Sequence, residues 1–178
     1  ALFVLNDRPD LVEACGADGV HVGRSDTPVE EARALVGPDR LVGVSVSTLD
    51  ELADVAGADY VGVTAFATPT KEDAVAGGLE LLEVAAATFS VPWFAIGGIE
   101  LANVTEVASA GAPGVAVVRA IRDAADPEEA ARMLRAMTVA HMSRSSLVYP
   151  TTVGFPVVPE EACTRATSDR GTANMPNG

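Results

Sequence analysis

The sequence predicts an α/β fold in which short buried strands alternate with amphipathic helices. Apolar runs recur about every twenty residues, which is the spacing of successive βα units. The runs are nearly continuous, as in parallel strands that are covered on both faces. With 48% apolar residues, the 178-residue chain is long enough for one packed core. The expected strands lie near residues 3–6, 19–22, 41–45, 60–63, 93–96 and 114–118.

Helical patterns fill the intervals between these strands. Residues 79–86 and 101–108 each place apolar side chains on one face of a helix. Asp126 has the properties of an N-cap, with Pro127 in the first turn and Glu129 at the third position, so a last helix should begin there.

The unit count indicates an incomplete (β/α)8 TIM barrel. A closed barrel needs eight units and six are visible, so we expect strands 3 to 8, with two units missing before Ala1. An open doubly wound sheet is the competing architecture, but no Gly-x-Gly-x-x-Gly follows any strand here. Glycine suits a left-handed helix end. A Gly-Ala-Asp or Gly-Ala-Pro motif occurs at Gly16, Gly57 and Gly111, and we expect a left-handed helix end at each of these glycines.

The composition changes after Met137, where Ser, Thr, Pro, Gly and Asn become frequent. We therefore expect a barrel domain over residues 1–137 and a mostly irregular, low-order tail over residues 138–178. Residues 147–158 are the exception. Their valines and aromatic residues could instead pair as a strand or cover an exposed edge of the sheet.

The charge and the cysteines restrict the functional class. Twelve basic residues stand against 25 acidic ones, and the whole net charge of −13 lies in residues 1–137, which argues against a nucleic-acid surface. An anionic ligand would need locally placed donors and a divalent cation. No apolar run reaches the roughly 18 residues of a membrane span. Cys15 and Cys163, the only cysteines, are not spaced as metal ligands, which indicates a reducing, cytoplasmic setting.

The most informative segment follows the fourth expected strand. Thr68, Thr70 and Lys71, the chain's only lysine, fall within four residues of one another. Pro69 stiffens the loop between the two hydroxyls, and lysine supplies a compact positive charge. This composition is typical of a phosphate-binding loop. The alternative is a solvated turn that contains a lysine.

Polar residues also follow the other expected strands, where a parallel barrel places its active site. Asp7 and Asp26 follow adjacent strands, so their carboxylates can converge and hold Mg²⁺ together with water and a ligand phosphate. The alternative for each aspartate, and especially for Asp26, is a helix N-cap. His21 lies in the middle of a strand and is expected in the core or a pocket wall. The other candidates are Asn6, Arg24, Ser45, Ser47, Gly97, Gly98, Val118 and Arg119.

The last two strands offer backbone amides rather than side chains. Gly97 and Gly98 allow a ligand to approach the backbone closely, and Val118 and Arg119 follow the final strand. Loops after strands seven and eight of such barrels often bind phosphate through their amides. Two tight turns that use glycine for geometry are the alternative.

Several motifs, taken in order and spacing, resemble the thiamine phosphate synthase (thiamine-phosphate pyrophosphorylase) family over residues 2 to about 135. They are Asn6-Asp7, Gly19 to Asp26, Gly43-Val-Ser45, Ala58 to Gly62, Thr68-Pro-Thr-Lys71, Ala95 to Ile99 and Gly114 to Ile121. The resemblance implies a transferase with a (β/α)8 barrel. It would join hydroxymethylpyrimidine diphosphate to hydroxyethylthiazole phosphate in a Mg²⁺-dependent step that releases pyrophosphate.

The resemblance also implies roles for individual residues. Asp7 and Asp26 would hold Mg²⁺ on the diphosphate, with Asn6 alongside. Ser45 and Lys71 would bind that leaving group and stabilise its departure, which is chiefly electrostatic catalysis. The thiazole phosphate would be held by Thr68, Thr70, Gly98 and the backbone at Val118 and Arg119.

The chain departs from the family pattern at several points. Arg24 stands where the family usually has glutamine, and Thr64-Ala65 where it has Gly-Pro. The family's first two strands, with a Gln-x-Arg-x-Lys-like segment, have no counterpart here. Two alternatives to the synthase therefore stay open. One is a thiazole tautomerase-like paralogue. The other is a truncated, non-catalytic remnant that binds thiazole phosphate or forms a homo-oligomer through exposed edge strands.

Overall fold

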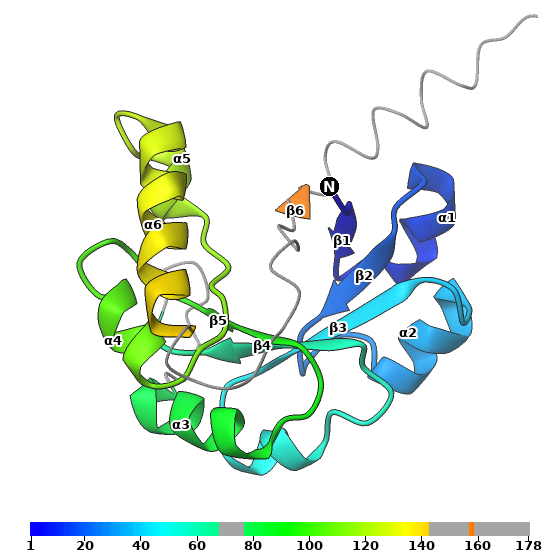
Figure 1. The fold of residues 1–178 in the computed structure, drawn as a ribbon. Coiled ribbons are helices and arrows are strands. Elements are labelled where there is room, and N and C mark those ends of the chain that lie inside the picture. Colours follow the sequence, from blue (N-terminus) through cyan, green and yellow to red (C-terminus); the bar gives the residue numbers. More distant parts are fainter. Residues whose placement is uncertain (68–76, 143–156, 159–178) are drawn as a thin grey trace, which may run out of the picture.

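A computed structural model describes residues 1–67, 77–142 and 157–158 of the chain. Its centre is a parallel sheet in the order β5-β4-β3-β2-β1-β6. The sheet curls into an open arc with helices on its outer side (Figure 1), which is the expected partial barrel. The strands are β1 (Val4–Asn6), β2 (Gly19–Val22), β3 (Leu41–Val46), β4 (Tyr60–Thr64), β5 (Trp93–Ile96) and β6 (Val157–Val158).

The helices lie between the strands as the sequence predicts. They are α1 (Val12–Cys15), α2 (Val29–Val36), α3 (Gly78–Thr88), α4 (Val104–Ser109), α5 (Arg119–Arg122) and α6 (Pro127–Met142), with 3-10 turns η1 (Pro9–Leu11) and η2 (Asp50–Ala53). Asp126 Oδ1 accepts the Glu129 N–H at 3.0 Å, which confirms the predicted N-cap of α6. That helix continues to Met142, five residues past Met137, the predicted end of the barrel domain. The three predicted left-handed glycines, Gly16, Gly57 and Gly111, all have positive φ.

The two faces of the sheet differ in burial. On β3, Val42, Val44 and Val46 are buried against the helical layer. Burying each valine stabilises the fold by about 1.5–3 kcal/mol. Ser45 alternates with them and is only half-buried on the inner face. The inner face is therefore the one that can carry polar chemistry.

The last expected strand, residues 114–118, is only partly formed. Ala95 pairs with Val115 in a single bridge, supported by the Ala95 N–H donating to the Gly114 carbonyl and the Ala116 N–H donating to the Ala95 carbonyl, both at 2.9 Å. Helix α5 begins directly afterwards at Arg119, and the pairing recorded for this segment is that one bridge to β5. The prediction of a full strand here was wrong.

The opposite edge of the sheet is covered by part of the expected tail. β6 pairs in parallel with β1, with Val4 opposite Val157 and Leu5 opposite Val158. Of the two alternatives for residues 147–158, strand pairing is therefore the one found at residues 157–158. The rest of that segment lies outside the described residues.

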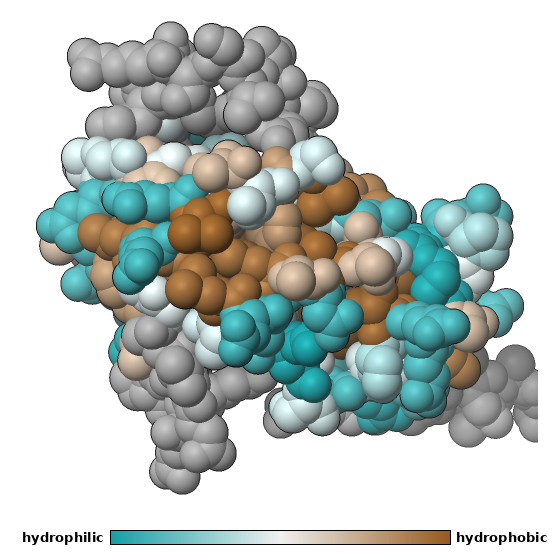
Figure 2. Space-filling view, turned by 90° about the horizontal axis from the view of Figure 1, so that it is seen from below, coloured by the Kyte–Doolittle hydropathy of each residue, from teal (hydrophilic) through white to brown (hydrophobic). Residues whose placement is uncertain are grey.

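The outer surface is not uniformly polar. Figure 2 shows apolar side chains gathered in the middle of the face seen from below, with polar side chains around them. Large apolar side chains such as Leu35 and Leu49 are more than half exposed. Apolar residues are thus not confined to the core, which is usual for folded proteins.

Candidate active site

The end of β1 makes an unusual turn at Asp7. Among the residues that the structure describes, Asp7 is the one non-glycine residue with positive φ, at 60°. Its N–H still donates to the His21 carbonyl at 2.8 Å, so the turn stays attached to β2. The Asn6 amide donates to Asp7 Oδ2 at 2.6 Å and fixes the orientation of the carboxylate. A backbone outlier of this kind is common at functional sites, and here it sits where the sequence places a metal ligand.

Asp26 closes the turn that follows β2. Its Oδ2 accepts the Gly23 N–H at 3.0 Å, and its own N–H donates to the Gly23 carbonyl at 3.2 Å. Helix α2 begins later, with Pro28 at the N-cap position and no side-chain capping bond. Asp26 is therefore not a helix cap, and the alternative to a metal role is closure of this turn.

The donor set at these two strand ends fits Mg²⁺ chemically. Asp7 and Asp26 are half-buried, follow adjacent strands, and supply hard carboxylate oxygens. Within the residues that the structure describes, no group of three or more His, Cys, Asp or Glu side chains could hold a metal. Such an ion would therefore complete its coordination with water and ligand phosphate, as Mg²⁺ commonly does.

The middle of the inner face carries a line of three hydrogen-bonded side chains. His21 Nε2 lies 2.8 Å from Ser45 Oγ, and His21 Nδ1 lies 3.0 Å from the Tyr60 hydroxyl. Gly43 pairs with both His21 and Tyr60 across the sheet, and a Cβ there would lie 2.1 Å from the Tyr60 ring. The absent side chain of Gly43 is what allows the Tyr60 ring to cross β3 and reach His21.

The ends of β4 and β5 are packed tightly against each other. A Cβ on Gly98 would lie 2.9 Å from Phe66 Cβ and 3.2 Å from the Ala67 carbonyl oxygen. The Gly98 φ of 59° also favours glycine. The Gly98 carbonyl accepts the Asn103 amide at 2.9 Å. Gly98 therefore lies directly beside the start of the expected phosphate-binding loop.

The core of that loop is outside the described residues, but both of its ends are held at β4. Thr68, Thr70 and Lys71 all belong to the part that is not described. The loop leaves from Ala67, next to Gly98, and the Gly78 N–H donates to the Ala65 carbonyl at 2.9 Å on its return. The loop thus starts and ends at the carboxyl end of one central strand.

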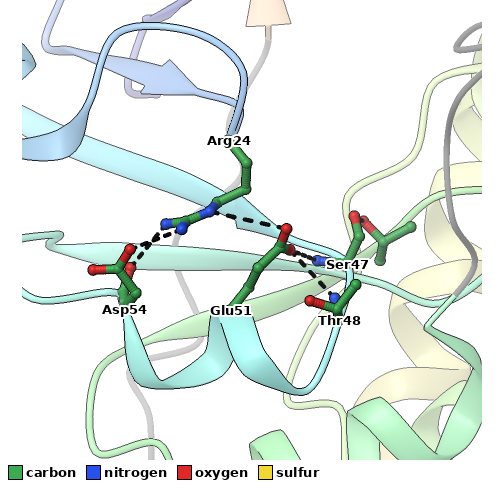
Figure 3. A network of polar contacts seen from close by, with 6 residues as sticks. Arg24, Ser47, Thr48, Glu51 and Asp54 are labelled. Carbon is green, nitrogen blue, oxygen red and sulfur yellow. Dashed lines mark hydrogen bonds and ion pairs between the residues drawn. The ribbon is translucent and has the colours of Figure 1, made fainter.

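Arg24 belongs to a separate network between β2 and η2 (Figure 3). Its Nη2 lies 2.7 Å from Asp54 Oδ2, and its Nε lies 3.9 Å from Glu51 Oε1. Glu51 Oε2 in turn accepts the Ser47 N–H at 2.6 Å and the Thr48 N–H at 3.3 Å. The guanidinium is directed at these carboxylates, so its clearest role is to fix the turn after β3.

The remaining predicted residues lie at two further places. Ser47 Oγ donates to Thr64 Oγ1 at 2.9 Å, which connects the ends of β3 and β4. Val118 is 64% exposed and precedes helix α5, which starts at Arg119. In the described part of the chain, no recorded hydrogen bond or ion pair joins Val118 or Arg119 to the other predicted site residues.

Comparison with known proteins gives the family. The family model described as thiamine monophosphate synthase matches residues 1–121. The chain belongs to this family. It is 52% identical over 137 residues to a thiamine-phosphate synthase of Synechococcus sp. (strain CC9311), and 50% identical over 139 residues to one of Methanoculleus marisnigri. A thiamine phosphate pyrophosphorylase from Pyrococcus furiosus superposes with a TM-score of 0.71 at 38% identity, covering 80% of this chain and 69% of that chain.

The matches cover different shares of the relatives. The alignments include 75% and 76% of this chain, but 39% of the Synechococcus protein and 66% of the Methanoculleus protein. The resemblance to the thiamine phosphate synthase family seen in the motifs is thus confirmed. The share covered means that the reaction of a whole synthase comes to this chain only as a proposal.

Sequence reasoning missed the partner of His21 in this family member. Tyr60 was expected only as part of a buried strand, and Asn103 was not singled out at all. The signal for Tyr60 was the interior glycine of β3, because a glycine inside a strand often marks a close approach by a neighbouring group. Asn103 gives no comparable signal, since its bonds to Gly98 and Glu100 depend on the shape of the turn.

Proposed function

We propose that this chain carries the diphosphate and thiazole phosphate sites of a thiamine phosphate synthase. The reaction couples hydroxymethylpyrimidine diphosphate with hydroxyethylthiazole phosphate, giving thiamine phosphate and pyrophosphate. The observation that carries the proposal is the set of polar groups at the carboxyl ends of β1, β2 and β3 in a chain whose family model matches residues 1–121. Active sites of parallel barrels lie at this edge.

Asp7 and Asp26 would hold the Mg²⁺ ion. When bound, the ion would supply positive charge that neutralises the diphosphate. Asn6 keeps the Asp7 carboxylate oriented through its amide. Ser45 would donate its hydroxyl hydrogen, and Lys71 its ammonium hydrogens, to the departing diphosphate. These donors act on charge that grows as the bond to the pyrimidine breaks, which is where electrostatic stabilisation accelerates a reaction.

The thiazole phosphate would bind between the β4 and β5 loops. The close packing of Gly98 on Phe66 and Ala67 supports this assignment, because Ala67 is the last described residue before the two threonines in the sequence. The Gly98 backbone N–H would be the group offered to a phosphate oxygen. The residues assigned to this phosphate are Thr68, Thr70, Gly98 and the backbone at Val118 and Arg119.

The metal assignment is tested by titrating Mg²⁺ into the chain with and without pyrophosphate in a calorimeter. Asp26→Asn removes one carboxylate charge and should weaken pyrophosphate-dependent Mg²⁺ binding at least about tenfold, a change of about 1.4 kcal/mol. Asp39→Asn makes the same change at an exposed position just before β3, at the opposite end of the strands, and should leave binding unaltered. Equal binding by the wild type and Asp26→Asn would show that Asp26 only closes its turn.

Turnover is tested with the full natural chain that contains these residues. Formation of thiamine phosphate from the two substrates would support the synthase assignment. Binding of thiazole phosphate without turnover would instead favour a non-catalytic protein. Release of pyrophosphate that depends on both substrates distinguishes coupling from simple hydrolysis of the diphosphate.

We also propose a cytoplasmic setting for the chain, which rests on the use of its two cysteines alone. As a separate finding, none of the described helices is long and apolar enough to cross a lipid bilayer. Cell fractionation, combined with thiol labelling of the native protein, tests the proposal. Recovery of the protein outside the cytoplasm would overturn it.

A further inference from the structure

The two hydrogen bonds that join Tyr60, His21 and Ser45 take their direction from the tautomer of His21. Burial, and secondarily the negative charge of Asp59, raise the pKa of Tyr60, so its phenol keeps its hydrogen at neutral pH. A buried phenol normally donates that hydrogen to a partner. The ring nitrogen at 3.0 Å from the hydroxyl is His21 Nδ1, which then acts as the acceptor.

The role of Nδ1 determines whether Nε2, the second ring nitrogen of His21, carries a hydrogen. A neutral imidazole carries one hydrogen, so an accepting Nδ1 leaves that hydrogen on Nε2. Nε2 lies 2.8 Å from Ser45 Oγ, and in this tautomer it would donate its hydrogen to that oxygen. The hydroxyl hydrogen of Ser45 cannot also lie on that line, so it is directed to another acceptor. Ser45 is thereby presented as a donor on the inner face of the sheet.

Packing holds the three groups in place. The His21 and Tyr60 rings have centroids 5.4 Å apart, and the Tyr60 ring contacts Phe94 edge-on at 6.2 Å. Gly43 leaves space for the Tyr60 ring, and a Cβ on Gly62 would lie 3.3 Å from His21 Cε1. Groups positioned by packing rather than by solvent are preorganised for a ligand.

We propose that Tyr60 is a positioning residue whose hydroxyl fixes the Nε2–H tautomer of His21 and so makes Ser45 a hydrogen-bond donor to an anionic oxygen of the substrate. Tyr60 and His21 act through Ser45 and need not touch the substrate themselves. The identity of that anion as a diphosphate rests on the proposed function above. The tautomer depends only on the protein.

The tautomer is measured by nitrogen-15 NMR of the histidine side chains, without any ligand. The chain has two histidines, and a His141→Gln variant assigns the remaining signals to His21. We expect Nδ1 of His21 to have the shift of an unprotonated nitrogen and Nε2 that of a protonated one. Tyr60→Phe keeps the ring but removes the hydroxyl, and should move the Nδ1 signal. The opposite tautomer in the wild type, or no change in Tyr60→Phe, would overturn the proposal.

The effect on Ser45 is measured with inorganic pyrophosphate and Mg²⁺. Losing one well-placed donor costs about 1–2 kcal/mol, so Tyr60→Phe and Ser45→Ala should each weaken binding about 5- to 30-fold. Both changes act on the same hydrogen bond from Ser45 to the ligand. The double variant should therefore bind no more weakly than Ser45→Ala. Additive losses would show that Tyr60 acts independently of Ser45 and overturn the positioning role.

Two controls test whether the effects are specific to Tyr60 and are not caused by the loss of any hydroxyl or by unfolding. Thr88→Val removes a hydroxyl that bonds only within α3 and should change neither the tautomer nor the binding. Circular dichroism of Tyr60→Phe confirms that the fold is retained. A wild-type chain that fails to bind pyrophosphate would refute the proposed function, while the NMR result would still decide the role of Tyr60.

Discussion

Gly43→Ala is the substitution that most directly tests the inner-face arrangement. Gly43 lies between His21 and Tyr60 in the sheet, and its backbone is not in the left-handed region. The new methyl group would lie 2.1 Å from Tyr60 Cζ and 2.5 Å from its hydroxyl oxygen. Two carbon atoms in ordinary contact are about 3.5–4.0 Å apart, so the Tyr60 ring must retreat by about 1.5 Å.

That displacement sets the expected loss of stability. Forcing an extra methyl group into a packed site costs about 1–3 kcal/mol. A retreat of about 1.5 Å would also break the bond between Tyr60 and His21, which contributes about 0.5–1.5 kcal/mol. We therefore expect Gly43→Ala to lower the free energy of unfolding by about 1.5–4.5 kcal/mol and to alter the His21 tautomer.

Urea denaturation measures the first effect, and nitrogen-15 NMR measures the second. Gly16→Ala is the matched control, because a Cβ there meets no atom within 4 Å and only the positive φ of 63° is strained. It should lose about 1 kcal/mol and leave His21 unchanged. If Gly43→Ala lost less than about 0.5 kcal/mol, the claim that the Tyr60 ring fills this space would be refuted.

Two further substitutions separate the ligand groups from the scaffold. Lys71→Ala should lower the turnover rate of the full natural chain by about 10²- to 10³-fold, because the lysine would stabilise the charge on the leaving group. The loss of thiazole phosphate affinity should be smaller. Equal losses in rate and affinity would assign Lys71 to the thiazole phosphate instead. Arg24→Gln should change the free energy of unfolding by at most about 1 kcal/mol, since its ion pair with Asp54 is exposed and its contact with the half-buried Glu51 is long, at 3.9 Å. Pyrophosphate titration should show no effect of that change, and a large loss of affinity would place Arg24 at the ligand.

The strands and helices could be predicted because local patterns determine them. Parallel strands bury one face against helices, so β2, β3 and β4 appear as valine-rich runs with clear ends. The N-cap at Asp126 could also be predicted from the sequence, because a cap depends on residues within one helical turn. The prediction for residues 114–118 failed because strand formation there depends on neighbouring segments and not on the run itself.

The candidate site could be predicted only as a set of strand ends. Which side chains meet depends on the lateral register of the sheet, and one sequence does not show that register. His21 and Tyr60 lie 39 positions apart in the sequence. Their side chains meet because Gly43, which stands between them in the sheet, has no side chain to keep them apart. The metal and phosphate assignments for Asp7, Asp26 and the β4 loop stay predictions.

The pairing of β6 with β1 gives a last prediction, about self-association. Val4 and Leu5 pair with residues 157–158, so this outer edge of the sheet is covered in the structure. A chain of residues 1–142 keeps α6 but loses the covering strand, and an open edge offers unpaired N–H and C=O groups to another molecule. We expect sedimentation velocity to show more self-association for residues 1–142 than for the whole chain. Replacing Val157 and Val158 with proline in the whole chain should reproduce the effect, because proline cannot donate to a ladder. If both variants sediment as the whole chain does, β6 does not protect the edge, and the β1 edge must be kept from pairing by its short length alone.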